Sequence, residues 1–262
     1  MVQPATITPL YTLAGLAVGM MVGLTGVGGG SLMTPLLVLV FGISPATAVG
    51  TDLLHSAVTQ AVGAGVHGAH GSVDWRVVRR LASGSVPATV AMLLLLAALG
   101  TRRAPSQQVI STVLGLAVLL TALMLLARGW LLRVLGSRLT RLAEGRATAL
   151  TIAAGAVLGA LVTLSSVGAG AVGVTALILL YPQFRTARIV GSDMAHTVPL
   201  TLLAGTGHWM LGSVDWHLLL SLLGGSVPGI VIGSLVAVRV PDRVIRPLLA
   251  CVLLAVGGRL VF

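Results

Sequence analysis

The chain contains the same short sequences twice at one constant spacing. The repeated elements, each 141 positions apart, are Gly-Ser-Val-Asp-Trp at 71–75 and 212–216, Gly-Ser-Val-Pro at 84–87 and 225–228, Val-Gly-(Thr/Ser)-Asp at 49–52 and 190–193, and His67 with His208. One register shared by four separate features indicates an internal duplication. Any fold of this chain must therefore be built from two similar halves.

The duplicated chain is also very apolar. Hydrophobic residues make up 56% of it and charged residues 8%, whereas soluble domains carry about 25% charged residues. Stretches of ~20 apolar residues, such as 76–100 and 108–127, are long enough to cross a bilayer as helices. The 34 glycines and 11 prolines are typical of close helix packing and broken helices in membranes. We therefore predict a multi-pass membrane protein with the two-repeat architecture of a secondary transporter.

The formal net charge of +10 does not indicate nucleic-acid binding. All 16 basic residues are arginine, and most lie near the ends of apolar runs, where they determine membrane topology. Cys251 is the single cysteine, which excludes a disulfide within this sequence. The residues before Tyr11 lack a basic segment and a cleavage site, so we predict no removable signal peptide.

The order of apolar segments predicts an all-α polytopic membrane protein with an N-terminal repeat (1–127), a basic linker (128–147) and a C-terminal repeat (148–262). Each repeat is expected to consist of a broken-helix hairpin followed by three transmembrane helices. The predicted segments are 10–24, 31–42, 46–70, 76–100 and 107–127, and then 148–163, 171–181, 187–211, 217–238 and 243–261. The junctions contain Pro45, Pro105, Pro182 and Pro241, as expected where helices begin or end.

Loop charges indicate how the two repeats are related. Three arginines lie at 76–80, after the first Gly-Ser-Val-Asp-Trp turn, but none follows the second turn closely. Conversely, Arg185 and Arg188 lie in a junction whose counterpart at 43–47 has no arginine. Because arginine favours cytoplasmic loops, equivalent loops prefer opposite sides, and we predict inverted-topology repeats. The arginine-rich linker 128–147 is predicted to be cytoplasmic.

Glycine-rich sequences interrupt the first apolar segment of each repeat, at 25–30 and 165–170. The flanking apolar pieces are short for a full crossing, so we predict half-helices that meet near the middle of the membrane. A helix that begins there directs backbone N–H groups and a positive dipole end at the break, which suits an anion. Close helix packing without a ligand is the alternative. The predicted substrate-binding residues are Thr25, Gly28, Gly29, Gly30, Ser31, Thr51, Ser165, Gly168, Ala169, Gly170 and Ser192.

Asp52 and Asp193 are each followed three positions later by a histidine, His55 and His196. Residues at i and i+3 share one face of a helix, and a charge inside a membrane segment is costly and usually functional. These four residues are therefore predicted to form a polar path or to couple transport. Three interpretations stay open for the aspartates: caps of neighbouring half-helices, proton-coupling acids, or pairs in which Asp and His satisfy each other.

Other polar residues suggest structural roles. Asp74 and Asp215 are predicted to cap the helices that follow them. The six histidines form no tight ligand cluster in the sequence, so we predict no metal site and no cofactor. An intramembrane serine hydrolase is a further alternative, but His55 and Ser56, as sequence neighbours, face different directions on a helix and have no third group to orient them.

Taken together, these motifs resemble the sulfite exporter TauE/SafE family of membrane permeases over nearly the whole chain. The resemblance is carried by Gly-Val-Gly-Gly-Gly-Ser at 26–31 with Pro35, Ala-Val-Gly-Thr at 48–51, the turn at 71–75, and the second copies at Gly168, 191–192 and 212–216. It implies export of sulfur-containing anions such as sulfite, sulfonates and related organosulfur acids. The chain departs from the family pattern at Asp52 and Asp193, where uncharged polar residues are expected, and in its weaker second glycine break.

The patterns and the resemblance together predict a secondary transporter that exports these anions across the cytoplasmic membrane by alternating access. Its substrate is expected at the helix breaks between the repeats, with Arg185 and Arg188 at the cytoplasmic mouth. The runner-up is a proton-coupled carrier for a different small solute that uses Asp52 and Asp193. The expected partners are a small sulfur-containing anion and the lipid bilayer, without nucleic acid. The sequence leaves the oligomeric state open.

Overall fold

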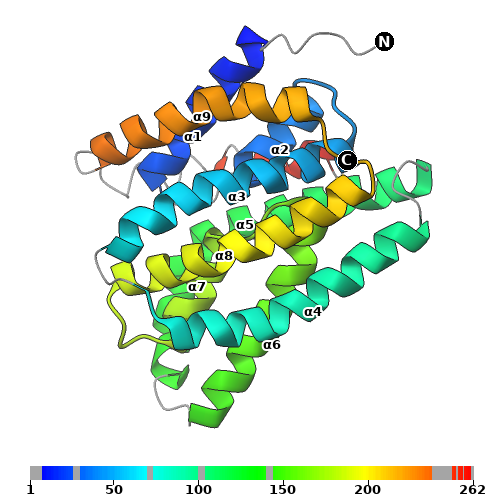
Figure 1. Cartoon of the computed structure of the whole chain (residues 1–262). Coiled ribbons are helices and arrows are strands. Elements are labelled where there is room, and N and C mark those ends of the chain that lie inside the picture. Colours follow the sequence, from blue (N-terminus) through cyan, green and yellow to red (C-terminus); the bar gives the residue numbers. More distant parts are fainter. Residues whose placement is uncertain are drawn as a thin grey trace.

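A computed structural model describes residues 8–25, 30–69, 73–99, 104–139, 144–237 and 250–260, except 252 and 256. In these ranges every regular element is helical, which confirms the predicted all-α class (Figure 1). The helices are α1 (Pro9–Thr25), α2 (Gly30–Leu39), α3 (Pro45–Ala69), α4 (Trp75–Leu99), α5 (Ala104–Leu139), α6 (Glu144–Ser165), α7 (Ala171–Leu180), α8 (Thr186–Met210) and α9 (Trp216–Ala237). Residues 250–260 are also helical at their described positions.

Proline and glycine set many of the helix ends. Pro45 is the first residue of α3, where its missing N–H has no helical partner to lose. Pro182 follows the end of α7. In the break between α6 and α7, Ser166, Gly168 and Gly170 have φ values of 58°, 112° and 94°. Because right-handed helix needs negative φ, this backbone leaves the helix at the predicted place.

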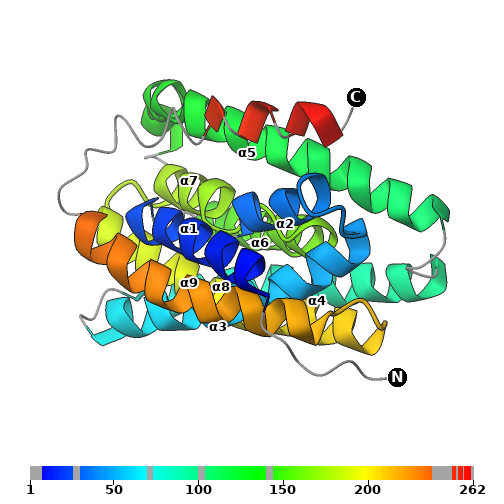
Figure 2. The ribbon, with the colours of Figure 1, turned by 90° about the horizontal axis from the view of Figure 1, so that it is seen from above.

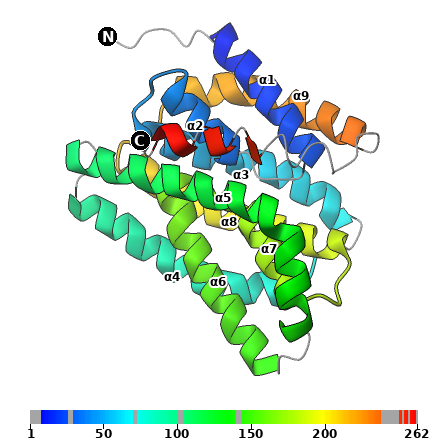
Figure 3. The same ribbon diagram turned by 180° about the vertical axis from the view of Figure 1, so that it is seen from behind.

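Helices α5 and α6 differ from their predicted lengths. The α5 helix continues from the predicted end at residue 127 to Leu139, and α6 begins at Glu144 instead of 148. Arg128, Arg133 and Arg138 of the linker lie within α5, because arginine is a good helix former. Glu144 begins α6, where an acidic residue favours a helix start. Figure 3 shows the last part of α5 turning away from the direction of its first part.

Four described helices, α4, α6, α9 and the 108–127 portion of α5, are long and apolar enough to cross a membrane. At 22 residues, α6 is longer than the predicted segment 148–163, and Thr151 near its beginning contacts Tyr181 just after the end of α7. The shorter helices α1, α2 and α7 are also apolar. These lengths agree with a multi-pass membrane protein.

The first helix of each repeat packs on the fourth helix of the other repeat. The α1 helix lies along α9, and α6 lies along α4 (Figures 1 and 2). A Cβ at Gly15 of α1 would collide with the carbonyl oxygen of Leu222, and one at Gly155 of α6 would collide with that of Leu81. Small residues allow such close contact between helices in a membrane. The same contact thus occurs twice, with the two repeats exchanged.

The third helices of the repeats, α3 and α8, contact each other at the centre of the fold (Figure 1). They run antiparallel, because Gly50 near the start of α3 lies beside Ser213 after the end of α8, and Gly205 lies beside Leu54. Both helices bury polar side chains. Buried on α3 are Thr51, Asp52, His55, Ser56, Thr59 and Gln60, and buried on α8 are Ser192, Asp193, His196, Thr197, Thr201 and His208.

Candidate functional site

The start of α2 lies against the break between α6 and α7. A Cβ on Gly30 would collide with the main-chain carbonyl of Ser166, so the two breaks, which are 136 positions apart in the chain (30 to 166), touch in the fold. Ser31 and Ser166 are 1% and 4% exposed. Neither hydroxyl has a hydrogen-bond partner within the described part of the chain. Two unpaired hydroxyls at a helix start are suited to an oxyanion.

The depth of this contact follows from the length of α7. Its 10 residues correspond to ~15 Å along the helix axis. That is about half of the ~30 Å thickness of the hydrocarbon core. A break at the start of α7 therefore lies near the middle of the membrane when the end of α7 lies at its surface.

The start of α7 is itself in contact with a buried carboxylate. Gly170 occupies the N-cap position without a side-chain cap, and its backbone N–H is close enough to the Asp193 carboxylate of α8 to interact with it electrostatically. A Cβ on Gly173 would collide with Asp193 Oδ1, so only glycine permits this approach. Asp193 thus lies where helix geometry favours negative charge.

The equivalent carboxylate in the first repeat is surrounded differently. Thr34 of α2 donates its hydroxyl to Asp52 Oδ2 at 2.5 Å. His55 Nδ1 lies 3.3 Å from Asp52 Oδ1, and His55 Nε2 lies 2.8 Å from Ser226 Oγ of α9. The Asp52–His55 pair is therefore closed, with a partner for each of its four polar side-chain atoms.

In the second repeat, His196 Nε2 lies 2.8 Å from Ser85 Oγ of α4, which reproduces the His55–Ser226 contact with the repeats exchanged. No bond joins His196 to Asp193 in the described chain. Asp193 Oδ1 and His196 Nδ1 both lack a partner there, although the two residues are only 2% and 1% exposed. The Asp193–His196 pair is therefore open.

Three of the hydroxyls predicted to bind substrate have protein partners. Thr51 Oγ1 accepts the Asp215 N–H at 3.0 Å. Ser192 Oγ accepts the Asp74 N–H at 2.8 Å and donates to a main-chain carbonyl at 2.7 Å. Ser165 Oγ donates to the main-chain carbonyl of Leu161 in α6 at 2.7 Å and accepts the Val167 N–H in the break at 3.2 Å. These hydroxyls hold turns together in this conformation.

The remaining predicted substrate residues fall into two groups. Gly168, Ala169 and Gly170 form the described break and are buried. Gly28 and Gly29, together with the side chain of Thr25, lie outside the described residues. The predicted caps are present: Asp74 Oδ1 accepts the N–H of Arg76 at 3.0 Å, and Asp215 Oδ1 accepts that of Leu218 at 3.0 Å.

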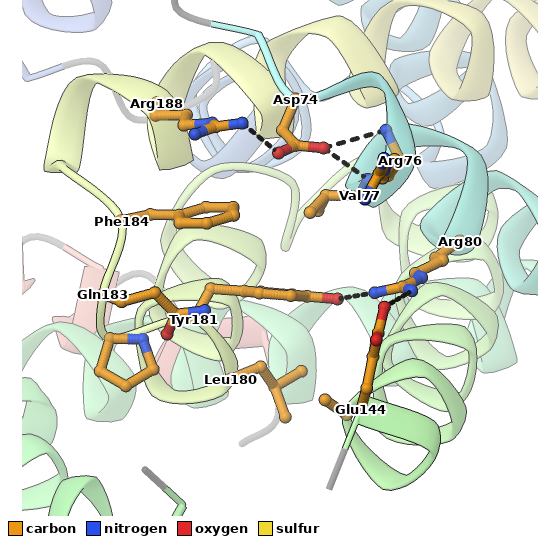
Figure 4. A pocket seen from close by; sticks show the side chains of 12 residues that line it. Asp74, Arg76, Val77, Arg80, Glu144, Leu180, Tyr181, Gln183, Phe184 and Arg188 are labelled. Atoms are coloured by element: carbon orange, nitrogen blue, oxygen red, sulfur yellow. Dashed lines mark hydrogen bonds and ion pairs between the residues drawn. The ribbon is translucent and has the colours of Figure 1, made fainter. Parts of the chain in front are cut away.

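A polar cavity of about 600 Å³ opens beside the end of α7 and the beginnings of α4, α6 and α8 (Figure 4). Its charged lining consists of Asp74, Arg76, Arg80, Glu144 and Arg188. Three arginines against two carboxylates leave an excess of positive charge. Arg185, the N-cap residue of α8, is exposed and lies outside this lining.

The side chains of this cavity bond across elements, as Figure 4 shows. Arg188 pairs with Asp74 at 2.6 Å. Arg80 contacts Glu144 at 3.0 Å and the hydroxyl of Tyr181 at 3.3 Å. These contacts connect α4 with α6 and α8, so the first repeat is tied to the second at the cavity.

A second cavity, of about 410 Å³, extends along α2 from Ser31 to Val40. Its lining is mainly apolar, and it includes Met21, Leu36, Leu253 and Arg259. Because Ser31 lies both here and at the contact between the breaks, this cavity begins at the candidate site.

Sequence reasoning missed several residues of these sites. Two of them, Ser85 and Ser226, could have been found from the sequence, because they occupy the same position in the repeated Gly-Ser-Val-Pro sequence. Arg80 and Tyr181 had no such signal, because their contact joins residues 101 positions apart. Among the described residues, no group of three or more His, Cys, Asp or Glu side chains is arranged to hold a metal ion.

Comparisons with known proteins agree with this architecture. The sulfite exporter TauE/SafE family model matches residues 11–260. The probable membrane transporter protein YjnA of Bacillus subtilis (strain 168) is 37% identical over 250 residues, which cover 95% of this chain and 98% of that protein. The probable membrane transporter protein YdhB of the same organism is 28% identical over 239 residues, or 90% and 93% of the two chains. No solved structure gives a significant match. This chain therefore belongs to the sulfite exporter TauE/SafE family of membrane transporters.

Proposed function

We propose that this protein is a secondary transporter that exports sulfur-containing anions, such as sulfite, sulfonates or related organosulfur acids, across the cytoplasmic membrane. The observation that carries the proposal is the contact between the two breaks, where the hydroxyls of Ser31 and Ser166 are buried and have no partner among the residues that the structure describes. A sulfur oxyanion presents three or more acceptor oxygens, which such hydroxyls and the backbone N–H groups of a helix start can bind without a buried arginine.

The family and the shape of the site both support the proposed substrate class. The matched family model describes sulfite exporters. The apolar cavity that begins at Ser31 suits the carbon portion of an organosulfonate, while the oxyanion stays at the break. We assign the oxyanion contacts to the residues of the two breaks, including Gly28 to Ser31 and Gly168 to Gly170.

Alternating access would come from rocking one repeat against the other around this contact. Inverted topology is part of the proposal, and it is supported by the antiparallel contacts of α3 with α8 and by the exchanged contacts of α1 with α9 and α6 with α4. Glu144 lines the polar cavity and directly follows the arginine-rich linker. Because arginine favours cytoplasmic loops, we assign the cavity to the cytoplasmic side. There its arginines would concentrate anions for export.

The membrane potential would provide the driving force. A potential that is negative inside favours outward movement of an anion by about 2.3 kcal/mol per charge per 100 mV. Export therefore requires no nucleotide hydrolysis.

Flux from proteoliposomes loaded with sulfite, sulfoacetate, taurine or sulfate, with and without an imposed potential, tests the proposal. We expect potential-dependent flux of the sulfur anions, which the double substitution Ser31→Ala with Ser166→Ala lowers at least tenfold, equivalent to about 1.4 kcal/mol. Ser83→Ala is the matched control, because Ser83 lies on the outer part of α4 and bonds only its own helix. The proposal fails if wild-type protein moves none of these anions, or if both variants transport equally well.

The alternative from the sequence is a proton-coupled carrier for a different small solute with Asp52 and Asp193 as equivalent proton sites. Equivalent sites require similar surroundings. Asp52 is bonded to Thr34 and His55, whereas Asp193 has an oxygen without a partner. This difference favours the anion exporter as the first candidate.

A further inference from the structure

Asp52 and Asp193 occupy the same position in the two repeats but differ in their hydrogen bonding. Asp52 Oδ2 accepts the Thr34 hydroxyl and Asp52 Oδ1 is next to His55 Nδ1. Each oxygen of this carboxylate therefore has a partner. An ionised carboxylate with two such partners is stabilised even when it is buried.

Asp193 lacks this stabilisation. Its carboxylate lies beside the Gly170 N–H at the start of α7, but its Oδ1 has no partner among the described residues. The Asp193 side chain is almost completely shielded from solvent. Burying an ionised carboxylate with an unsatisfied oxygen is strongly unfavourable, so such a group is expected to bind a proton or a cation.

A proton matches the nearby groups. His196 Nε2 is engaged with Ser85, so a proton on Nε2 makes Nδ1 an acceptor. That Nδ1 is buried and has no partner within the described ranges, and it lies one helical turn from Asp193. A single proton on Asp193 Oδ1 would let the carboxylic acid donate to His196 Nδ1, and both unsatisfied atoms would gain a partner.

We propose that the Asp193–His196 pair is a proton-binding site, and that loading it prepares the start of α7 for an anion. The proton comes from the aqueous phase and forms the O–H bond of the carboxylic acid. When ionised, Asp193 places its own negative charge at the N-terminus of α7 and competes with an anion there. When protonated, it turns toward His196, as Asp52 is directed to His55, and the helix start becomes free. The inference rests on the proposed function only for the identity of the anion.

Besides this pair, the buried titratable atom without a partner in the described part of the chain is Nδ1 of His208, 12 positions from His196 along α8. The α7 helix has no titratable residue. The charged and titratable groups on the other elements that pack against α8 are Asp52, His55 and His67 on α3, Arg76, Arg79 and Arg80 on α4, and Glu144 and Arg146 on α6. On α8 itself, Arg188 is paired with Asp74 and His208 Nε2 contacts the Thr163 carbonyl. Asp52 and His55 are already engaged with each other.

Two measurements on purified full-length protein test this site, with Asp193→Asn and its symmetry-matched control Asp52→Asn. The first is pH-difference infrared spectroscopy without any substrate. We expect the carbonyl band of a protonated carboxylic acid to appear on acidification in the wild type and in Asp52→Asn, and to be lost in Asp193→Asn. Loss of the band in Asp52→Asn alone, or its presence in all three proteins, overturns the proposal.

The second measurement is the affinity for methanesulfonate, whose charge does not change over the working pH range. We expect the affinity of wild type and Asp52→Asn to weaken as the pH rises through the titration of Asp193, approaching about tenfold per pH unit. Asp193→Asn should bind as tightly as protonated wild type at every pH. Unchanged pH dependence in Asp193→Asn contradicts the linkage.

The two proposals fail separately. A missing infrared band together with normal sulfonate flux removes the proton site and leaves the exporter. A band that depends on Asp193, in a protein that binds and moves no sulfur anion, removes the proposed substrate and leaves the proton site.

Discussion

Gly30 at the start of α2 lies directly against the main-chain carbonyl of Ser166 in the break between α6 and α7. Because backbone meets backbone here, even one methyl group must displace a helix. We expect Gly30→Ala to lower the melting temperature and abolish transport, although alanine is intrinsically a better helix former than glycine by about 1 kcal/mol. Thermal unfolding in detergent and proteoliposome flux measure the two effects.

Gly224 on α9 is the matched control for this substitution, because a Cβ added there meets no atom within 4 Å. Gly224→Ala should therefore keep transport and should leave the melting temperature unchanged or raise it. If Gly30→Ala behaves like Gly224→Ala, the two breaks are not in contact.

The reciprocal serine–histidine contacts lead to a second prediction. Ser85→Ala and Ser226→Ala each leave a buried imidazole nitrogen without its partner, which costs about 1–3 kcal/mol. We expect similar losses of stability for the two variants in chemical denaturation. A large loss in one variant and none in the other would show that the repeats do not use this contact equivalently.

The two capping aspartates should respond differently to removal of charge. Asn still caps a helix, so Asp215→Asn should leave the free energy of unfolding unchanged. Asp74→Asn should lose the ion pair with Arg188. Because the Arg188 side chain is half exposed, this ion pair contributes about 1 kcal/mol or less to the free energy of unfolding. Arg188→Gln should lower the free energy of unfolding by the same amount. In a double-mutant cycle, the double variant should be destabilised no more than either single variant.

The positive cavity should affect how fast anions are captured. Arg80→Gln removes a charge from its lining, whereas Arg146→Gln removes a charge that lies outside it. We expect Arg80→Gln to lower the initial flux at low substrate concentration more than the Arg146 variant. The difference should shrink with added salt, because the Debye length falls from about 10 Å at 0.1 M to about 3 Å at 1 M. A difference that does not depend on salt argues against an electrostatic role.

Membrane topology can be tested at equivalent loops. Ser44 lies between α2 and α3, and Gln183 lies between α7 and α8; both are exposed. After Cys251→Ala, a cysteine at each position should react with an impermeant maleimide from opposite sides of the membrane. Labelling from one side in both variants would rule out inverted repeats.

The sequence predicted the helices well because membrane segments are read from long apolar runs, and because prolines such as Pro45 begin them. It predicted the second break from glycine, and the backbone of Gly168 and Gly170 confirms it. It could not reveal the partners of two hydroxyls predicted to bind substrate, because those partners come from distant parts of the chain. Thr51 and Ser192 bond amides of turns more than 100 positions away.

The duplication also concealed a difference. Asp52 and Asp193 look equivalent in sequence, since each precedes a histidine by three positions. Their surroundings depend on residues of the adjacent half-helix. Thr34 reaches Asp52, whereas Thr175 of α7, the counterpart of Thr34, bonds a carbonyl of its own helix. Such a difference arises from tertiary packing and becomes visible only when both halves are in place.

The exchange of first helices between the repeats also affects how the protein is made. During synthesis, α1 enters the bilayer long before α9 has been made, so α1 is first surrounded by lipid instead of packing against α9. A nascent chain that stops after α5 therefore leaves the α9-facing surface of α1 without its partner helix. Two copies of a half-length ancestor would have exchanged the same helices between subunits, so gene fusion would have preserved an interface that already existed.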